Sequence, residues 1–435
     1  MKKKILAIII SAVMTAACLT GCGSKTEGET KKIENNSDSM NSGTQDGTSD
    51  DLIANLIAST EGEVSLTVWV SEEDQNLTNG LIESFEAEYP DVKFNITLIP
   101  ESEASAKDNL LVDVEAGPDI FTFADDQINE LVKAEALKEV NIAYSYDIKD
   151  SNVAGAIDAA TVDNKLYAYP MTADNGYVMF YDASVFTEED VKSMDTMIAK
   201  AKAVNKKIAM DISNGWYIYS FFQGAGYELS LNEDGFTNTC NWNENGGTDV
   251  AQAIVNMLDT GVLVDLSDED QVSQITDGKI CAAVNGTWRA ETAQQAWGKN
   301  YAATKLPTFT VSGEQKQMSS FSGYKLIGVN PYSEYVEWSM ILAEYLTNYD
   351  SQVIRYEKRG FGPSNIEAAN SDIVLADPAI SALAAQAEFA TPQRVGSNYW
   401  VAAEELGKNL VKGAEGDNLQ SLLDKAVEGI TAPTE

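Results

Sequence analysis

The sequence predicts an α/β protein with more than one domain and largely parallel sheets. Strand-like apolar runs alternate with helix-like segments, which is typical of parallel sheets covered by helices. This alternation restarts after residue 182. A chain of 435 residues is also long enough to bury two sizeable hydrophobic cores.

The first half of the expected fold begins with a strand over 64–70, "VSLTVWV", which is rich in β-branched residues. Apolar residues then recur at helical spacing until Pro90 ends the pattern. Further strands are expected over 92–99, 119–124, 165–170 and 177–182, and helices over 101–116 and 129–138.

The second half repeats this organisation. Strands are expected over 207–212, 279–286 and 324–330, and helices over 188–203 and 248–260. From Glu334 onward the pattern is mostly helical, with breaks near 360–363 and 377–378.

The stretch "SNGWYIYSFFQGAGY" over 213–227 is predicted to divide into two parts. Ser213 or Asn214 is suited to cap a helix, so side chains of the first turn would point past the strand ends. Phe221 and Phe222, one turn further, are expected in the core, and the glycines after them end the helix. The position of Tyr219 stays open.

The first residues carry an export signal. "MKKK" precedes an apolar run over 5–17 that is short for a membrane span, and "LTGC" follows and ends at Cys22. This arrangement resembles the lipobox of bacterial lipoproteins, which implies a signal peptide over 1–21 and a diacylglyceryl group on Cys22. The alternative is a membrane-inserted N-terminus with an incidental cysteine.

A polar segment separates Cys22 from the folded part. Residues 23–50 are almost devoid of large apolar side chains, so nothing there offsets the entropy of ordering. We therefore predict a lipidated N-terminus and flexible linker over 22–61, which would tether the protein to the extracytoplasmic face of the cell membrane.

Charge and cysteine content exclude several partners. The formal net charge is −37, which argues against nucleic acid and against anionic lipid surfaces. After processing, only Cys240 and Cys281 would accompany Cys22, and they could form a disulfide or remain buried thiols. Their spacing does not suggest a metal site, and no cofactor is expected.

The chain has no histidine, which removes Ser-His-Asp and Cys-His catalysis and histidine-ligated zinc. Neither a dinucleotide-binding nor a phosphate-binding glycine motif is present. Paired carboxylates, as used in glycoside hydrolysis, remain an enzymatic alternative, but so acidic a sequence holds many chance pairs.

Aromatic residues stand beside short polar groups at the ends of several predicted elements. Phe123 precedes two aspartates at a strand end, Trp288 and Arg289 follow a strand, and Tyr399 and Trp400 open a late helix. Ligands of open α/β sheets bind outside the carboxyl ends of strands. Aromatic faces with carboxylates and amides suit a sugar, which has C–H faces and ring-edge hydroxyls.

Several segments carry a family resemblance in the expected order: "LTVWV", "AGPDIFTFADD", "NKLYAYP", "DGKICAAVNGTW", "KLPTF" and "FGPSNIEAA". From about residue 64 to 430 the chain resembles the extracellular solute-binding proteins of ATP-binding-cassette importers, the family that includes bacterial maltose-binding protein. The resemblance implies a monomeric, non-enzymatic receptor that delivers oligosaccharides to a membrane permease.

The resemblance also implies the two-lobed periplasmic-binding-protein fold, with a ligand cleft between lobes that close by hinge motion. The N-terminal lobe would take 62–173 and 311–375, and the C-terminal lobe 177–306 and 378–430. Hinge segments would lie near 172–177, 307–311 and 375–378.

The resemblance carries ligand contacts to specific positions of this sequence. These are Glu73, Asp74, Phe123, Asp126, Asp174, Asn214, Trp216, Tyr217, Trp288, and Tyr399 or Trp400. Arg289 is a further candidate ligand contact, because it follows a predicted strand beside Trp288. Asn214 and Asp74 replace a glutamate and a lysine of the maltose binder, so hydroxyl pairing must differ.

Malto-oligosaccharides are the leading ligand expectation. Xylo-, manno- and galacto-oligosaccharides remain alternatives. A surface glycoside hydrolase and a glycan-binding adhesin without a transport role are alternatives from other functional classes.

Overall fold

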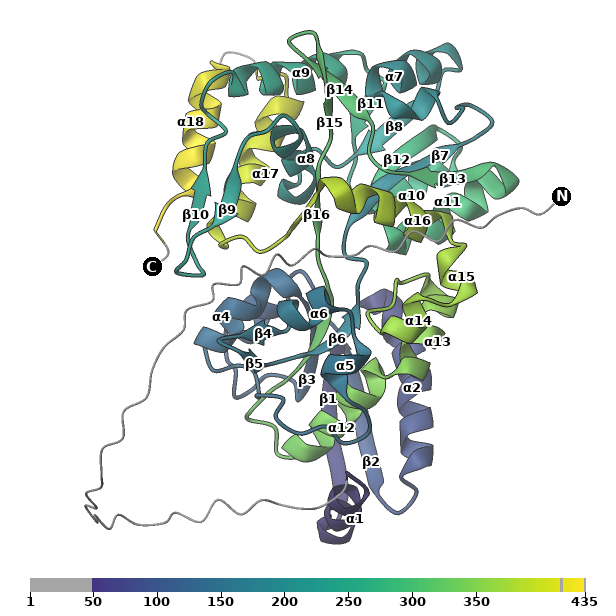
Figure 1. Cartoon of the computed structure of the whole chain (residues 1–435), viewed down its shortest axis with the longest axis vertical. Coiled ribbons are helices and arrows are strands. Elements are labelled where there is room, and N and C mark those ends of the chain that lie inside the picture. Colours follow the sequence, from purple (N-terminus) through teal and green to yellow (C-terminus); the bar gives the residue numbers. More distant parts are fainter. Residues whose placement is uncertain (1–48, 415–417, 434–435) are drawn as a thin grey trace, which may run out of the picture. The chain divides into compact units, whose positions relative to one another are not determined.

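The computed structural model describes residues 49–414 and 418–433, and two five-stranded sheets organise them (Figure 1). The signal segment and Cys22 lie outside these residues. None of the helices in the described part has the length and apolarity needed to cross a bilayer. Each sheet has its own core, and we call the two halves the N-terminal and C-terminal lobes.

The N-terminal lobe is built on the sheet β2-β1-β3-β17-β6. Strands β1, β2 and β3 are parallel, whereas β17 runs antiparallel to both of its neighbours. The strands of this sheet are β1 (Glu63–Val70), β2 (Lys93–Pro100), β3 (Ile120–Ala124), β6 (Tyr169–Thr172) and β17 (Lys325–Val329). The lobe also holds a two-stranded sheet of β4 (Thr161–Val162) and β5 (Lys165–Leu166).

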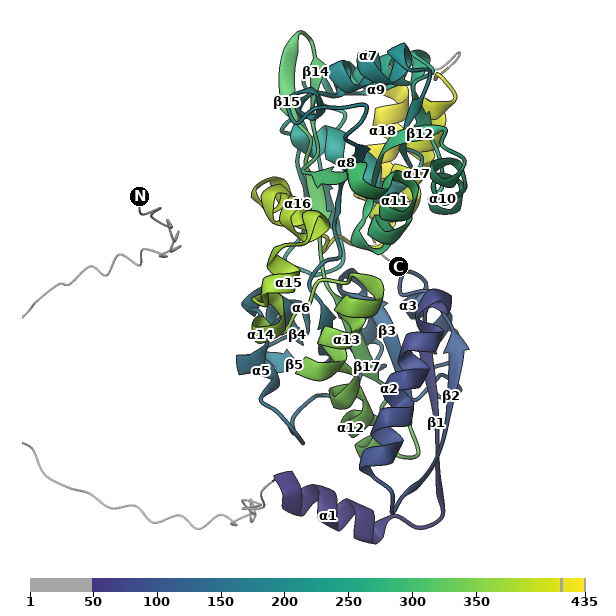
Figure 2. The same cartoon turned by 90° about the vertical axis from the view of Figure 1, so that its right-hand side faces the viewer.

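Helices of this lobe pack on that sheet, and Figure 2 shows α2 alongside β1 and β2. They are α1 (Ser49–Ser59), α2 (Gln75–Glu88), α3 (Ala106–Leu110), α4 (Ile128–Lys133), α5 (Ile148–Ser151), α6 (Ala154–Ala159), α12 (Val336–Thr347) and α13 (Tyr349–Arg359). Two short helices, α14 (Ile366–Ala369) and α15 (Asp372–Leu375), lead back towards the C-terminal lobe.

The C-terminal lobe is built on the sheet β11-β8-β12-β7-β13. Strands β11, β8 and β12 are parallel, and β7 runs antiparallel to both of its neighbours, β12 and β13. They are β7 (Tyr177–Asp182), β8 (Lys207–Met210), β11 (Leu263–Asp265), β12 (Ile280–Gly286) and β13 (Tyr301–Thr304). Short strands β9 (Leu229–Leu231), β10 (Asn238–Cys240), β14 (Thr308–Val311), β15 (Glu314–Gln317), β16 (Ser320–Ser322) and β18 (Ala390–Pro392) complete it.

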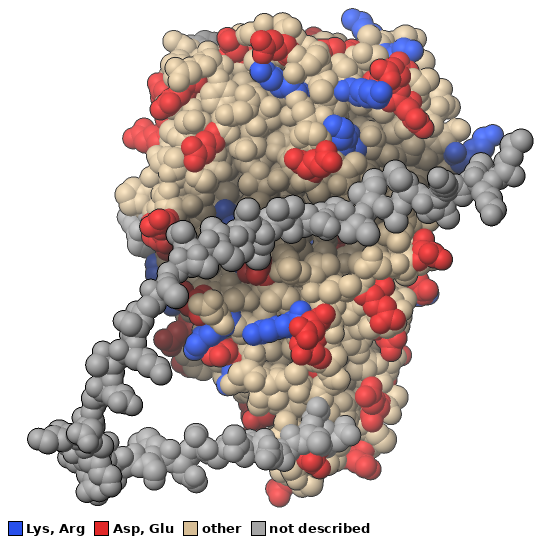
Figure 3. All heavy atoms as spheres, in the orientation of Figure 1, with Lys and Arg blue, Asp and Glu red and all other residues tan. Residues whose placement is uncertain are grey.

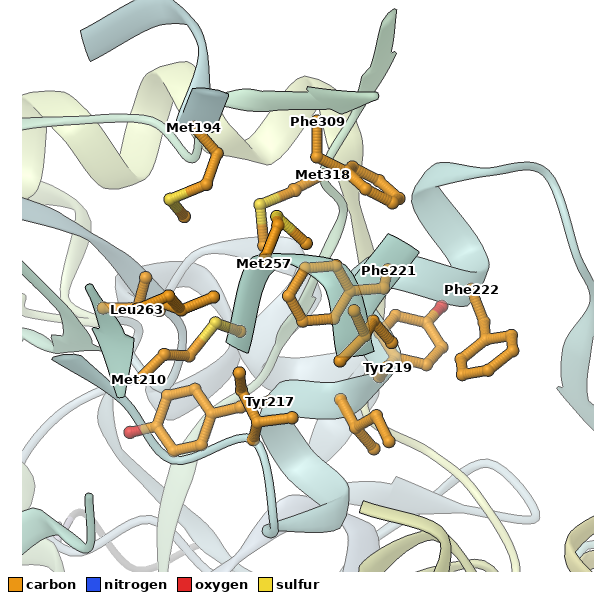
Figure 4. Packing of buried hydrophobic residues seen from close by; sticks show 14 of the residues in the cluster. Met194, Met210, Tyr217, Tyr219, Phe221, Phe222, Met257, Leu263, Phe309 and Met318 are labelled. Atoms are coloured by element: carbon orange, nitrogen blue, oxygen red, sulfur yellow. The ribbon is translucent and has the colours of Figure 1, made fainter. Parts of the chain in front are cut away.

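The helices of the C-terminal lobe enclose a large aromatic core. They are α7 (Met194–Ala203), α8 (Gly215–Gly224), α9 (Gly247–Asp259), α10 (Asp268–Thr276), α11 (Ala290–Trp297), α16 (Pro378–Gln386), α17 (Asn398–Val411) and α18 (Leu419–Ile430). Figure 4 shows Tyr217, Tyr219, Phe221 and Phe222 of α8 among the side chains of this core. Tyr219, whose position the sequence left open, is buried and stacks on Phe321 with ring centroids 3.8 Å apart.

The predicted ends of the linker and of a lobe segment differ from the structure. Residues 49–59, expected in the linker, form helix α1, whose Leu52, Ile53, Leu56 and Ile57 pack against the core of the N-terminal lobe. Hinge residues 307–311 and the start of a lobe at 311 were also misplaced. Phe309 and Val311 belong to the core of the C-terminal lobe, and the chain enters the N-terminal sheet only at Lys325.

The two remaining cysteines lie apart from the cleft in buried positions, and both are free thiols. Burial raises the pKa of each to about 12, so neither holds a reactive thiolate at neutral pH. The disulfide alternative for Cys240 and Cys281 is therefore not the arrangement in the structure.

Candidate functional site

A cleft of about 840 Å³ lies where the carboxyl ends of parallel strands from both sheets meet. Glu73 follows β1 and Asp126 follows β3 in the N-terminal lobe. Asn214 follows β8 and Trp288 follows β12 in the C-terminal lobe. The carboxyl edge of a parallel sheet is the usual ligand edge of α/β folds, and here two such edges face one space.

Helix α8 brings the first aromatic residue to the cleft. The Asn214 side chain caps the helix by accepting a hydrogen bond of 2.9 Å from the backbone N–H of Trp216. This cap places Trp216 and Tyr217 in the first turn, at the cleft, while Phe221 one turn later is fully buried. The predicted division of this stretch into a cleft end and a core end agrees with this arrangement.

Two tryptophans form an aromatic platform in the cleft. The rings of Trp216 and Trp288 stack with centroids 5.7 Å apart and an interplanar angle of 26°. Gly286 makes room for this arrangement, because a Cβ atom there would lie 2.1 Å from the Trp288 ring. Phe361 and Trp400 add further apolar surface to the cleft lining.

Cationic groups in the cleft are already paired with carboxylates. Arg289 donates from Nε to both carboxylate oxygens of Asp268, at 2.9 and 2.8 Å, and lies 3.8 Å from Glu73 of the other lobe. Lys325 lies 3.7 Å from Glu103, and its Nζ is 5.4 Å from the centre of the Trp288 ring. These contacts place fixed charges from both lobes beside the aromatic platform.

The carboxyl groups of the cleft differ in protonation behaviour. Burial raises the pKa of Asp126 well above its usual range, and the neighbouring Asp125 adds to the effect. Burial, together with nearby Asp265, raises the pKa of Asp211 to about 6. Burial opposes ionisation of Asp268 as well, but hydrogen bonds from Arg289 and Asn285 outweigh it and lower its pKa.

Most of the sequence-predicted contact residues come together in this cleft. Those that line it are Glu73, Asp126, Asn214, Trp216, Tyr217, Trp288, Arg289 and Trp400. Tyr217 is only 4% exposed, so little of its side chain is accessible from the cleft.

Four of the residues predicted to contact the ligand do not line the cleft in this structure. Asp74 is buried and pairs with Arg359 Nε at 2.7 Å. Phe123 is buried in β3 beside Phe121, because both faces of this central strand are covered. Asp74 therefore reaches the cleft only through Arg359, which lines it.

The other two residues, Asp174 and Tyr399, are buried and form hydrogen bonds with neighbouring segments. Asp174 accepts from Thr287 Oγ1 at 2.5 Å and from the backbone N–H of Gly362 at 2.7 Å. Tyr399 donates its hydroxyl to the Gly215 carbonyl at 2.5 Å. Of the predicted pair Tyr399 and Trp400, only Trp400 therefore reaches the cleft.

Sequence reasoning missed cleft residues that follow no predicted strand. They are, among others, Asn175, Lys325, Arg359, Phe361 and Gln393. Phe361 stands in the "FGPSN" segment, where a helix break marked a loop, and this was the one available signal. Gln393 lies in a polar loop with no distinguishing pattern.

The described residues hold no group of three or more His, Cys, Asp or Glu side chains arranged to bind a metal ion. The side chains that line the cleft can bind a ligand through hydrogen bonds, charge and aromatic stacking.

Comparison with known proteins gives a family match. Residues 80–382 match the model of a family described as bacterial extracellular solute-binding proteins. Among curated relatives, a galactooligosaccharide-binding protein of Bacillus subtilis is 28% identical over 345 residues, which cover 75% of this chain and 79% of that protein. A maltooligosaccharide ABC transporter solute-binding lipoprotein of Streptococcus pneumoniae is 22% identical, covering 70% and 73%.

Solved structures agree with the fold. A structure described as being with acarbose is 30% identical, has a TM-score of 0.77, and covers 85% of this chain and 99% of its own. The maltodextrin-binding protein MalE1 of L. casei is 26% identical with a TM-score of 0.71, covering 86% and 100%. The predicted two-lobed α/β fold is confirmed.

Proposed function

Because the chain belongs to the bacterial extracellular solute-binding proteins, we propose that it is a receptor that binds an oligosaccharide in the cleft between its lobes. The observation that carries this proposal is the stacked pair Trp216 and Trp288, flanked by Asp126 and Glu73 of the other lobe. Sugar C–H faces stack on such rings, while ring-edge hydroxyls bond to fixed carboxylates.

The dimensions of the cleft favour a chain of sugars over a monosaccharide. Its volume of about 840 Å³ is near the upper end of the range for small-molecule sites. Aromatic residues lie along it as Trp216, Trp288, Phe361 and Trp400, which offers more than one sugar subsite. We expect micromolar affinity, or about −8 kcal/mol.

Recognition would proceed by lobe closure. Ligand groups would bond to side chains of both lobes, so a bound glycan interacts more favourably with the closed arrangement than with an open one. This difference in affinity shifts the population towards the closed form. The membrane permease of an ABC importer would then bind the closed form of the receptor.

Malto-oligosaccharides are the ligand that we favour. Relatives named for maltooligosaccharide and maltodextrin, and the structure with acarbose, support this choice. A galacto-oligosaccharide is the second candidate, because the Bacillus subtilis relative with that name has the higher identity among the curated relatives above.

The "LTGC" segment supports attachment to the membrane through a diacylglyceryl group on Cys22. In this arrangement the receptor would remain on the extracytoplasmic face, close to its permease. Cys22→Ser should release the mature protein from the membrane fraction, whereas continued fractionation with membranes would contradict lipid anchoring.

A glycan panel followed by calorimetry tests the proposed function. The panel should include maltotetraose, galacto-oligosaccharides, xylo- and manno-oligosaccharides and acarbose. We expect stoichiometric binding of one class and unchanged glycans after prolonged incubation. Absence of binding to every member would refute the proposal, and hydrolysis abolished by one carboxylate substitution would favour the glycosidase alternative.

A further inference from the structure

Gln393 occupies the point where the hinge, the aromatic platform and the N-terminal lobe meet. It directly follows β18, which pairs with β16 just before the chain enters the N-terminal sheet at Lys325, and its backbone N–H donates to the Ser322 carbonyl at 2.9 Å. Its side chain lines the cleft, yet the residue is only 2% exposed.

The Gln393 amide uses all of its hydrogen-bonding capacity within the protein. Oε1 accepts from Trp216 Nε1 at 3.2 Å and from Asn175 Nδ2 at 3.1 Å. Nε2 donates to Asp125 Oδ1 at 2.8 Å and to Asp126 Oδ1 at 3.3 Å. An amide has two donors and two acceptor sites, so no strong bond is left for a ligand.

The orientation of this amide follows from its partners. With oxygen and nitrogen exchanged, an N–H would face the N–H groups of Trp216 and Asn175, and an oxygen would face two aspartates. The contacts to Trp216 and to the two aspartates would become unfavourable, and the contact to Asn175 would require that amide to exchange its oxygen and nitrogen as well. Glutamine therefore fits this place in one orientation.

Gly323 provides the space for this network. A Cβ atom at this glycine would lie 2.6 Å from Asp125 Oδ1 and 2.7 Å from Gln393 Cδ. The Gly323 carbonyl accepts from the Asn175 backbone N–H at 3.2 Å, which ties a second hinge segment to the same point.

We infer that Gln393 is a positioning residue for solute binding, whose amide holds the Trp216 indole of one lobe and the Asp126 carboxylate of the other in a fixed mutual arrangement. The inference rests on the proposed function, because both held groups would contact the glycan. Gln393 itself acts through them and not by touching the ligand.

Gln393→Glu is the most specific test, because it preserves shape and replaces the donating N–H₂ by an oxygen. At pH 7.5 the new carboxylate faces Asp125, which is also ionised because burial raises its pKa only to about 6. We expect the affinity of the full chain for its best-bound glycan to fall at least tenfold. At pH 5 the new carboxyl can be protonated and donate to Asp125, so affinity should recover towards that of the unsubstituted protein at pH 5.

Other charged groups near the Gln393 network also influence the affinities that are compared at the two pH values. Arg394 lies near Asp125, and Lys107 and Glu130 lie near Asp126. They are common to both proteins, so the ratio of affinities at each pH isolates the new carboxyl. The matched control is Gln386→Glu, where a buried amide outside the cleft bonds Leu306 N and Met318 O. Its affinity should follow the unsubstituted protein at both pH values.

A readout without ligand separates this inference from the proposed function. The emission of Trp216 is obtained as the difference between each protein and its Trp216→Phe counterpart. We expect this emission to shift in Gln393→Leu and in Gly323→Ala, and to stay unchanged in Gln386→Glu. The shift would support positioning even if no glycan binds.

Two results would overturn the inference. One is glycan binding by Gln393→Glu at pH 7.5 with unaltered affinity. The other is an unchanged Trp216 emission in both Gln393→Leu and Gly323→Ala.

Discussion

Two aromatic residues of helix α8 show how one turn separates binding from stability. Trp216 lies in the first turn, half-buried, with its ring at the cleft and its Nε1 on Gln393. Phe221 is fully buried and packs edge-to-face on Phe309 with centroids 5.2 Å apart. The same residue class in the same helix therefore serves two purposes.

Substitution of these two residues should separate affinity from stability. Trp216→Ala should weaken glycan binding by about tenfold or more, because it removes one stacking face. Phe221→Ala should lower the free energy of unfolding by about 3–5 kcal/mol, because it leaves a cavity in the core. Calorimetric titration and chemical denaturation of both variants measure the two effects, and equal losses of stability would contradict this division.

Site residues were predictable where they follow a strand of a parallel sheet. Glu73, Asp126 and Trp288 follow strands whose apolar pattern is clear in the sequence, and the carboxyl edge then places them at the cleft. Phe123 and Tyr399 are buried outside the cleft lining, which was not predictable because local sequence does not tell which face of a strand or helix another element covers. That information arises only from tertiary packing.

At the scale of elements, helix α1 extends the folded part beyond the first strand. Its apolar residues pack against the N-terminal core, and Thr60 just after it accepts a hydrogen bond of 2.9 Å from Trp338 Nε1. The sequence analysis placed this helix in the linker, because it is short, only moderately apolar and preceded by a polar segment. The helix links the segment that carries Cys22 to the N-terminal lobe.

Substitutions in α1 should therefore reduce stability although the linker prediction implied no effect. Leu56→Ala should lower the free energy of unfolding by about 1–2 kcal/mol, which is less than a fully buried leucine because this residue is half-buried. The exposed neighbour Asn55 provides the control, since Asn55→Ala should change little. Equal unfolding curves for both variants would show that α1 does not stabilise the lobe.

The strands were better predicted than the hinge. Strands expected over 64–70, 177–182 and 279–286 correspond to β1, β7 and β12 within one residue at each end. The hinge near 307–311 was misplaced because the β14–β15 hairpin packs Phe309 into the C-terminal core. A contact between residues so far apart in the chain produces no periodic pattern of apolar residues from which it could be predicted.

At the scale of the whole molecule, acidic residues dominate, and Figure 3 shows them scattered over the face that it draws. Several carboxyls are nevertheless buried near the cleft. Burial raises the pKa of Asp125 to about 6, and the pKa values of Asp126, Asp174 and Asp211 are also raised. Asp125 and Asp174 are buried, whereas Asp126 and Asp211 are half-buried and line the cleft.

These raised pKa values predict that stability falls as pH rises from about 4 to above 6. In this window the folded chain holds more protons than the unfolded chain, so unfolding becomes easier as protons are withdrawn. Asp125→Asn should stabilise the protein at pH 7.5 by on the order of 2 kcal/mol and have little effect near pH 4. Asparagine keeps the Oδ1 acceptor for Tyr324 N and Gln393 Nε2.

Denaturation of both proteins across this pH range provides the measurement. Parallel stability curves for the unsubstituted chain and Asp125→Asn would contradict the assignment of a raised pKa to this carboxyl.

The proposed glycan site depends on the aromatic platform that the C-terminal lobe presents to the cleft. Trp288 stacks on Trp216 of its own lobe and lies beside Lys325 of the other. It belongs to a short 3-10 turn after β12 and is half-buried, so its removal leaves both cores intact. A glycan held by stacking must lose affinity when this ring is removed.

The most direct test is a calorimetric titration of Trp288→Ala with the glycan that the unsubstituted protein binds best, alongside a thermal melt. We predict at least a tenfold loss of affinity, about 1.4 kcal/mol or more, with a melting temperature within a few degrees of the original. Unchanged affinity in a folded Trp288→Ala protein would contradict the assignment of this cleft as an aromatic glycan site.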